Sequence, residues 1–265
     1  MSQKEGKASD GFGYWHDSKC PLQSLIFLLP LVLVYELGLL RYGLDHLRQV
    51  SRDIFARRLL YDFFEWFGIS GYYLPGLIVI VALLSLHLVR RDRWRFKPRV
   101  YVGMGFESFV LAVPLFVFGL VAPLQHTVVA PVLERVGEAS LHDQTSAFPW
   151  QAGLVFGIGA GIYEEFVFRM IGLALLHALL ADVLRLPERW SATMSIVLSA
   201  VAFSLYHFSF DGRQPFVWSL FIFYAFAGVY FAGLYLMRGF GVVAGTHAIY
   251  NVLVVLFRMM ERGGG

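Results

Sequence analysis

The sequence predicts an all-α polytopic membrane protein, a bundle of about seven transmembrane helices with one further amphipathic helix in the membrane interface. The first observation behind this is composition: of the 265 residues, 57% are hydrophobic and 15% are charged, whereas soluble domains are about a quarter charged. The second is length, because the apolar residues form runs of about 20, which is the length that crosses a bilayer. The third is that arginines gather in short stretches beside these runs, as they do in membrane loops.

The expected spans follow one another closely and leave no room for a separate soluble domain. Residues 1–21 are expected to form a polar, disordered N-terminal tail. Residues 22–149 form an N-terminal transmembrane region, residues 150–260 a second helix bundle, and residues 261–265 a flexible tail. The seven spans are predicted at about residues 22–40, 72–89, 105–124, 150–181, 191–210, 216–237 and 242–259.

Residues 41–71 mix charged and apolar residues at helical spacing, which predicts an amphipathic helix in the headgroup layer. A lid over a catalytic site is the alternative for the same helix. In the span before it, Glu36 is expected either to extend toward the membrane surface or to pair with Arg41. The polar positions of the amphipathic helix are assigned to Arg48, Arg52, Arg57 and Arg58.

The net charge of +3 comes largely from one basic run at residues 90–99. Because this run directly follows a predicted span, its expected partner is the anionic surface of the bilayer, and no nucleic acid is expected to bind. The same run favours an orientation with the N-terminus inside. The single cysteine, Cys20, excludes an internal disulfide and a metal site built from several cysteines.

Three ionisable residues, Glu164, Glu165 and Arg169, lie inside the predicted span 150–181. An ionised side chain at bilayer depth costs several kcal/mol unless it is paired or faces a wet cavity. Glu165 and Arg169 are one helical turn apart and can pair with each other. Glu164 points about 100° away from Glu165, so it needs a partner on another helix.

Glycines recur every four residues before these charges, at Gly153, Gly157 and Gly161. On a helix they form one smooth face, which lets a neighbouring helix approach closely. The next two positions at the same spacing of four residues are Glu165 and Arg169, so these two residues follow the glycines on the same face of the helix.

Two later spans carry polar residues that could join Glu164. His207 lies near the end of span 191–210, and His247 and Asn251 lie one turn apart in span 242–259. Carboxylates and imidazoles can activate water directly as general bases, or through a bound divalent metal. In a regular bundle, however, the two histidines differ in depth by about 15 Å, so a stagger, a tilt or a break near residues 212–215 has to bring them level.

The order of these motifs resembles the CPBP family of intramembrane proteases, which includes the CAAX prenyl endopeptidases of the Rce1 type and bacterial relatives. The resemblance covers somewhat under half of the chain. It is carried by Glu164-Glu165-x-x-x-Arg169, then Phe203-x-x-x-His207, then His247-x-x-x-Asn251.

The resemblance implies a function and a role for each residue. Glu164 would act as general base, and His207 would hold and polarise the attacking water. His247 and Asn251 would position or stabilise the oxyanion, and Glu165 with Arg169 would be a structural pair. A zinc ion held by Glu164, His207 and His247 stays open, but a metal-free glutamate mechanism without any cofactor is favoured.

The expected activity is that of an endopeptidase which cuts a membrane-associated protein or peptide, as in the processing or sorting of C-terminal tails. The short chain favours a bacterial member in the inner membrane. Two alternatives remain at this point. One is a transporter or proton-pathway protein that uses buried Glu, His and Arg, and the other is a non-catalytic immunity or scaffold protein with the same fold.

Overall fold

The computed structural model describes residues 10–42, 54–71, 73–121, 150–208 and 216–263, and every regular element in these ranges is helical. The predicted all-α fold is therefore confirmed. The break expected near residues 212–215 lies outside the described residues. The elements are α1 (Asp10–Asp17), α2 (Pro21–Tyr42), α3 (Phe55–Glu65), α4 (Leu74–Arg90), α5 (Pro98–Val121), α7 (Trp150–Glu165), the π-helical segment η3 (Phe166–Leu173), α8 (Ala174–Ala178), the π-helical segment η4 (Leu179–Val183), α9 (Glu188–Tyr206), α10 (Trp218–Arg238) and α11 (Phe240–Gly263).

Among the described helices, five are long and apolar enough to cross a membrane, fewer than the seven or so expected. α4 is apolar but has only 17 residues. α9 is not among the five, because it begins with Glu188 and Arg189 and its buried face carries serines. The five are Pro21–Tyr42, Pro98–Leu120, Trp150–Val183, Trp218–Arg238 and Phe240–Met260.

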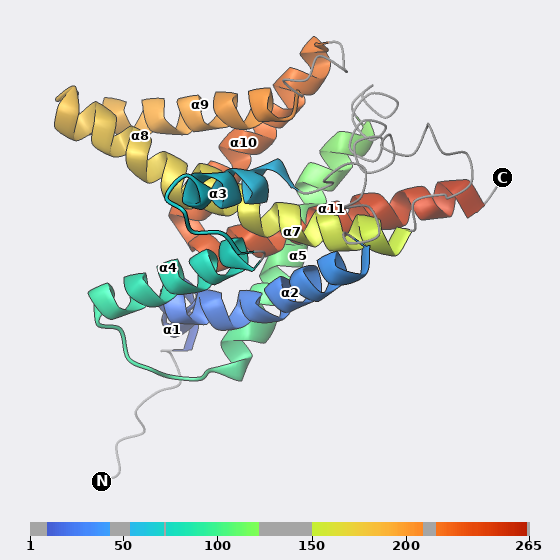
Figure 1. Cartoon of the computed structure of the whole chain (residues 1–265), viewed down its shortest axis with the longest axis horizontal. Helices are drawn as coiled ribbons and strands as arrows, with labels where there is room; N and C mark the ends of the chain where they lie inside the picture. Colours follow the sequence, from blue (N-terminus) through green and yellow to red (C-terminus); the bar gives the residue numbers. More distant parts are fainter. Residues whose placement is uncertain (1–9, 43–53, 72, 122–149, 209–215, 264–265) are drawn as a thin grey trace, which may run out of the picture.

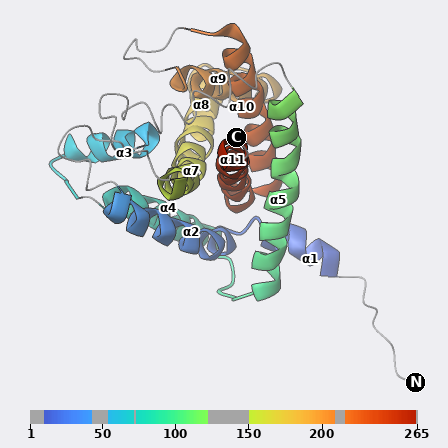
Figure 2. The ribbon, with the colours of Figure 1, turned by 90° about the vertical axis from the view of Figure 1, so that its right-hand side faces the viewer.

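The helices α7 and α11 form the centre of the molecule (Figure 1). Figure 2 shows them side by side, with α5 along the flank of α11, α2 and α4 on one side, and α9 and α10 on the other. Because α2 packs on both α7 and α11, the N-terminal helices support the part of the chain that carries the motifs.

The glycine face of α7 lies against α11, as its spacing predicts. A methyl group added at Gly153 would lie 3.5 Å from Val255, and one added at Gly157 would lie 3.0 Å from Asn251. At Gly161 it would lie 2.4 Å from the backbone nitrogen of Ala248. The two helices therefore come closest one turn before Glu165.

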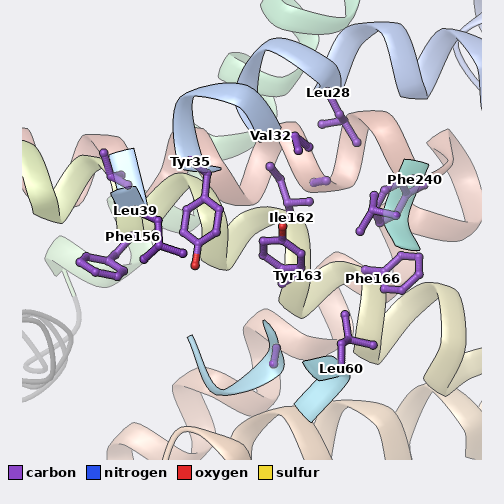
Figure 3. Close-up of a cluster of buried hydrophobic side chains, with 14 of the residues drawn as sticks. Leu28, Val32, Tyr35, Leu39, Leu60, Phe156, Ile162, Tyr163, Phe166 and Phe240 are labelled. Atoms are coloured by element: carbon purple, nitrogen blue, oxygen red, sulfur yellow. The ribbon is translucent and has the colours of Figure 1, made fainter. Parts of the chain in front are cut away.

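The other side of α7 packs into the largest apolar cluster, which also includes residues of α2, α3, α4 and α11 (Figure 3). In its centre the rings of Tyr35 and Tyr163 meet edge to face, with their centroids 5.3 Å apart. Tyr163 directly precedes Glu164, so this cluster fixes the backbone that carries the two carboxylates. Its larger members are Leu28, Val32, Tyr35, Leu39, Leu60, Phe156, Ile162, Tyr163, Phe166 and Phe240.

The expected pairing of Glu36 with Arg41 is wrong. Tyr163 donates a hydrogen bond of 2.6 Å to Glu36 Oε1, and Arg57 Nη2 lies 3.6 Å from Glu36 Oε2. Arg57 is only 2% exposed, so its assignment as a surface position of the amphipathic helix is also wrong. Both errors have one cause: α3 turns this arginine inward, where it meets a buried carboxylate that Arg41 does not reach.

The rest of α3 agrees with an amphipathic helix. Phe55, Leu59 and Phe63 are exposed on one side, while Ala56 and Leu60 are buried on the other. Arg48 and Arg52 lie outside the described residues. The exposed apolar side is the face that an interfacial helix turns to lipid.

The disorder expected at the N-terminus is wrong from Asp10 onward, since α1 is docked on α5 and α10. Tyr14 donates a hydrogen bond of 2.6 Å to Glu107, which also accepts one of 2.7 Å from Arg238. Burial raises the pKa of Tyr14, which keeps its hydroxyl protonated as a donor. The guanidinium of Arg238 lies 3.5 Å from the ring centroid of Trp15. At the other terminus, α11 continues to Gly263, into the segment expected to be a flexible tail.

Candidate active site

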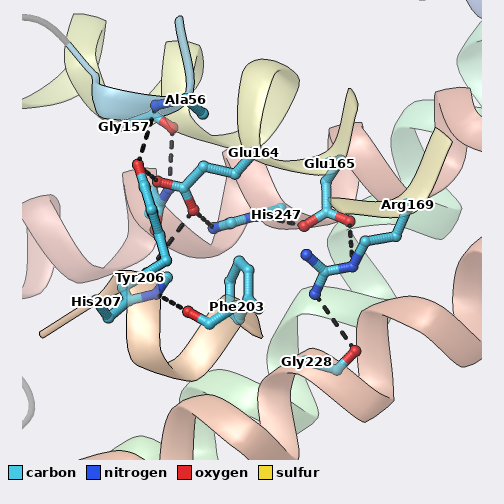
Figure 4. A network of polar contacts seen from close by, with 11 residues as sticks. Ala56, Gly157, Glu164, Glu165, Arg169, Phe203, Tyr206, His207, Gly228 and His247 are labelled. Atoms are coloured by element: carbon cyan, nitrogen blue, oxygen red, sulfur yellow. Dashed lines mark hydrogen bonds and ion pairs between the residues drawn. The ribbon is translucent and has the colours of Figure 1, made fainter. Parts of the chain in front are cut away.

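Glu164 lies at the end of α7, only 6% exposed, and its two oxygens have different surroundings. Oε1 accepts a hydrogen bond of 3.1 Å from the hydroxyl of Tyr206. Oε2 makes no hydrogen bond and lies 3.7 Å from His207 Nε2 and 3.9 Å from His247 Nε2 (Figure 4). Both distances are longer than a hydrogen bond.

His207 stands at the C-terminal end of α9, where its ring is held from two sides. Nδ1 lies 2.7 Å from the carbonyl oxygen of Phe203, and the ring stacks on Tyr224 with centroids 4.1 Å apart. A carbonyl can only accept, so Nδ1 carries the hydrogen. In the neutral ring, Nε2 therefore faces Glu164 with its lone pair.

His247 lies in the second turn of α11, stacked on Phe231 with centroids 4.5 Å apart. Its Nδ1 lies 2.8 Å from Glu165 Oε1, and its Nε2 is the atom that faces Glu164. One imidazole thus stands between the two adjacent carboxylates. A carboxylate at Nδ1 fixes the orientation of the ring.

The ion pair predicted between Glu165 and Arg169 is present, with Arg169 Nε 3.1 Å from Glu165 Oε2 and both side chains fully buried. Arg169 Nη2 also donates to the carbonyl oxygen of Gly228 on α10 at 3.3 Å, and its guanidinium lies 4.2 Å from the ring centroid of Phe203. Arg169 belongs to the π-helical segment η3, which starts directly after Glu165. Such segments are frequent at functional sites.

Asn251 lies one turn beyond His247, but the structure shows it in contact with α7. Its amide nitrogen donates a hydrogen bond of 2.9 Å to the carbonyl oxygen of Gly157. One amide hydrogen is therefore used to hold α11 on α7, and any contact with an oxyanion has to be made by the other.

The difference in depth expected between His207 and His247 does not arise. The Nε2 atoms of His207 and His247 lie 3.7 Å and 3.9 Å from the same oxygen, Oε2 of Glu164. His207 directly follows the last residue of α9, while His247 lies in the second turn of α11. The estimate assumed a regular bundle with upright spans, whereas Figure 1 shows α9 lying roughly along α7 and α10 running obliquely to both.

The metal site left open by the sequence would consist of Glu164, His207 and His247. These residue types can bind zinc, and both imidazoles have the Nδ1 partner that zinc-binding histidines usually have. Within the described ranges, however, no group of three or more His, Cys, Asp or Glu side chains is arranged closely enough to hold a metal ion. The preference for a metal-free mechanism stays a prediction.

Tyr206 was not predicted as a site residue. It precedes His207, and neighbouring residues on a helix point about 100° apart, so no shared role was expected. Its contact with Glu164 depends on the end of α9 lying over α7, which no spacing in the sequence reveals.

Comparison with known proteins agrees with the motifs. A family model described as "Type II CAAX prenyl endopeptidase Rce1-like" matches residues 146–253. This part of the chain is similar to that family. The match confirms the resemblance drawn from the motifs and supports a peptidase that acts on membrane-associated proteins or peptides. No curated protein and no solved structure matches the chain.

Proposed function

We propose that the protein is an intramembrane endopeptidase in which Glu164 activates a water molecule for attack on a peptide bond. The observation that carries the proposal is the buried oxygen Oε2 of Glu164, which makes no hydrogen bond and faces two imidazole nitrogens. A water held among these three atoms lies next to a base and to groups that can orient it.

The proposed steps are balanced in protons. Glu164 Oε2 takes one proton from the water, while the other O–H bond stays intact and donates a hydrogen bond to the lone pair of His207 Nε2. The water oxygen attacks the carbonyl carbon, and the resulting oxyanion is stabilised by the protonated His247 and the amide of Asn251. Glu164 then gives its proton to the leaving amine as the C–N bond breaks.

Glu165 and Arg169 have supporting roles in this proposal. The carboxylate of Glu165 lies 2.8 Å from Nδ1 of His247 and stabilises the imidazolium that faces the oxyanion. Arg169 compensates the charge of Glu165, because a buried carboxylate without a partner is strongly destabilising. No metal is needed for these steps.

The proposed setting is the inner membrane of a bacterium, with the N-terminus inside. The exposed basic residues of the run 90–99 would contact anionic headgroups. The substrate would be a protein held at the membrane, cut near its C-terminal tail.

The test replaces the wild-type protein by the Glu164→Gln variant in the cells that naturally contain it. The membrane proteome of these cells is then compared with that of wild-type cells. Uncut substrates should accumulate with Glu164→Gln and also with His207→Ala. The matched control is Glu188→Gln, the same substitution at an exposed carboxylate whose partner is His177 at 3.0 Å. Cleavage that continues at the wild-type rate with Glu164→Gln would overturn the proposal.

A further inference from the structure

The hydroxyl of Tyr206 connects the candidate general base to α3. It donates to Glu164 Oε1 at 3.1 Å, and it accepts a hydrogen bond of 3.4 Å from the backbone N–H of Ala56 (Figure 4). We propose that Tyr206 is a positioning residue, which holds Oε1 of Glu164 so that Oε2 faces the two imidazoles. The inference rests on the proposed function of Glu164.

The carboxyl group of a glutamate needs such a restraint. Its terminal torsion has no sharp energy minima, so the two oxygens of Glu164 can exchange places or turn away from the histidines. Oε2 itself makes no hydrogen bond. Among the described contacts of Glu164, the hydrogen bond from Tyr206 is therefore the one that selects a rotation of the carboxyl group.

The hydroxyl is itself held in place by the packing of its ring. The ring of Tyr206 meets Phe168 of η3 edge to face, with centroids 5.2 Å apart, and Phe55 of α3 at 5.6 Å. It also lies edge to face with His207, with centroids 5.1 Å apart. Two other elements, η3 and α3, thus hold the ring and with it the distance between the hydroxyl and α7.

The contact with Ala56 explains why the Tyr206 hydroxyl donates its hydrogen to Glu164. The first N–H groups of a helix have no partner within the helix, and Ile54, which caps α3, gives no side-chain hydrogen bond. The Tyr206 oxygen accepts one of these N–H groups, which leaves its own hydrogen to point toward Glu164. The ion pair of Arg57 with Glu36 then ties the same turn of α3 to α2.

The experiment compares Tyr206→Phe with Tyr230→Phe in the full-length protein in liposomes. Both substitutions remove one hydroxyl hydrogen, since Tyr230 donates to the backbone of α5 at 2.7 Å, but Tyr230 is outside the site. Two quenched fluorescent probes are used, a peptide with a farnesylated CaaX terminus and a peptide anchored by an unlipidated transmembrane segment.

With the probe that is cleaved, Tyr206→Phe should lower kcat about 10- to 100-fold, the equivalent of one hydrogen bond to a charged group. KM should stay within about twofold, because the substrate is not contacted. The acidic limb of the pH–rate profile should move to higher pH, because a carboxylate that loses a donor is protonated more readily. His207 and His247, the other titratable groups that face Glu164, are unchanged in both variants.

The outcomes separate the two proposals. If Glu164→Gln is inactive but Tyr206→Phe has the rate and pH profile of wild type, the positioning role is wrong and the proposed base stands. A lower rate with an unshifted pH profile also overturns the role, because loss of folded protein lowers the rate equally at every pH. If wild type cleaves neither probe, or Glu164→Gln cleaves as wild type does, the proposed function and the inference that rests on it both fall.

Discussion

Replacing Gly161 by alanine is expected to separate α11 from α7 and to impair the site more than the fold. The added methyl carbon would lie 2.4 Å from the backbone nitrogen of Ala248 and 2.6 Å from its Cα. Backbone atoms cannot rotate out of the way as a flexible side chain can. The helices therefore have to move apart by about 1 Å to reach the 3.4 Å of ordinary contact.

This movement acts directly on His247, the residue before Ala248 in the chain. Overpacking a tight interface typically costs about 1–3 kcal/mol, partly offset by the roughly 0.5–1 kcal/mol by which alanine favours a helix over glycine. The expected loss of stability is thus moderate. A displacement of about 1 Å at a catalytic group, in contrast, can lower the rate about 100-fold.

Other glycines supply matched controls. Gly153→Ala on the same face of α7 meets Val255 at 3.5 Å, and Gly233→Ala on α10 meets nothing within 4 Å. Both should keep wild-type activity, with a small gain in stability. Gly157→Ala, whose methyl carbon would lie 3.0 Å from Asn251 Cβ, should fall between them and Gly161→Ala.

The assay measures cleavage and the thermal unfolding midpoint for the four variants in the same lipid. The expected order of activity loss is Gly161, then Gly157, then Gly153 and Gly233 together. If folded Gly161→Ala protein cleaved as fast as Gly233→Ala, the close approach of α7 and α11 would not be what positions His247, and the reasoning would be refuted.

Two further predictions concern the charges of the site. Arg169→Ala should lower the free energy of unfolding by about 3–5 kcal/mol, because Glu165 is left buried without its cation; Arg189→Ala, at an exposed position of α9, is the control. An Arg169→Ala protein as stable as that control would contradict the pairing. Removal of divalent metals with a chelator should leave cleavage unchanged. A loss that zinc restores would instead assign Glu164, His207 and His247 to a metal.

Part of the site could be predicted from spacing within single helices. Gly153, Gly157 and Gly161 predicted a close neighbour, and the structure identifies it as α11. The same step predicted the Glu165–Arg169 pair, which lies at 3.1 Å. These predictions hold because the geometry of one helix determines them.

Predictions that needed the relative placement of two helices were less successful. The partner of Glu36 was sought at Arg41 in its own helix, but Arg57 arrives from α3. For His207 and His247, an upright bundle gave a difference in depth of about 15 Å, so the sequence indicated only that a stagger, a tilt or a break had to bring them level. Tyr206 was overlooked for the same reason, since its contact with Glu164 is set by how α9 ends over α7. No periodicity in the sequence contains that information.

The two adjacent carboxylates have different roles because one imidazole lies between them. Neighbouring residues on a helix point about 100° apart, and His247 reaches both, with Nδ1 2.8 Å from Glu165 and Nε2 3.9 Å from Glu164. The short contact belongs to the carboxylate that Arg169 compensates, and the long one to the carboxylate whose oxygen makes no hydrogen bond. The carboxylate that orients the ring, Glu165, is thereby a different group from the carboxylate that can take a proton, Glu164. The two roles cannot be exchanged, because it is Glu165 whose Oε2 lies 3.1 Å from Arg169 Nε.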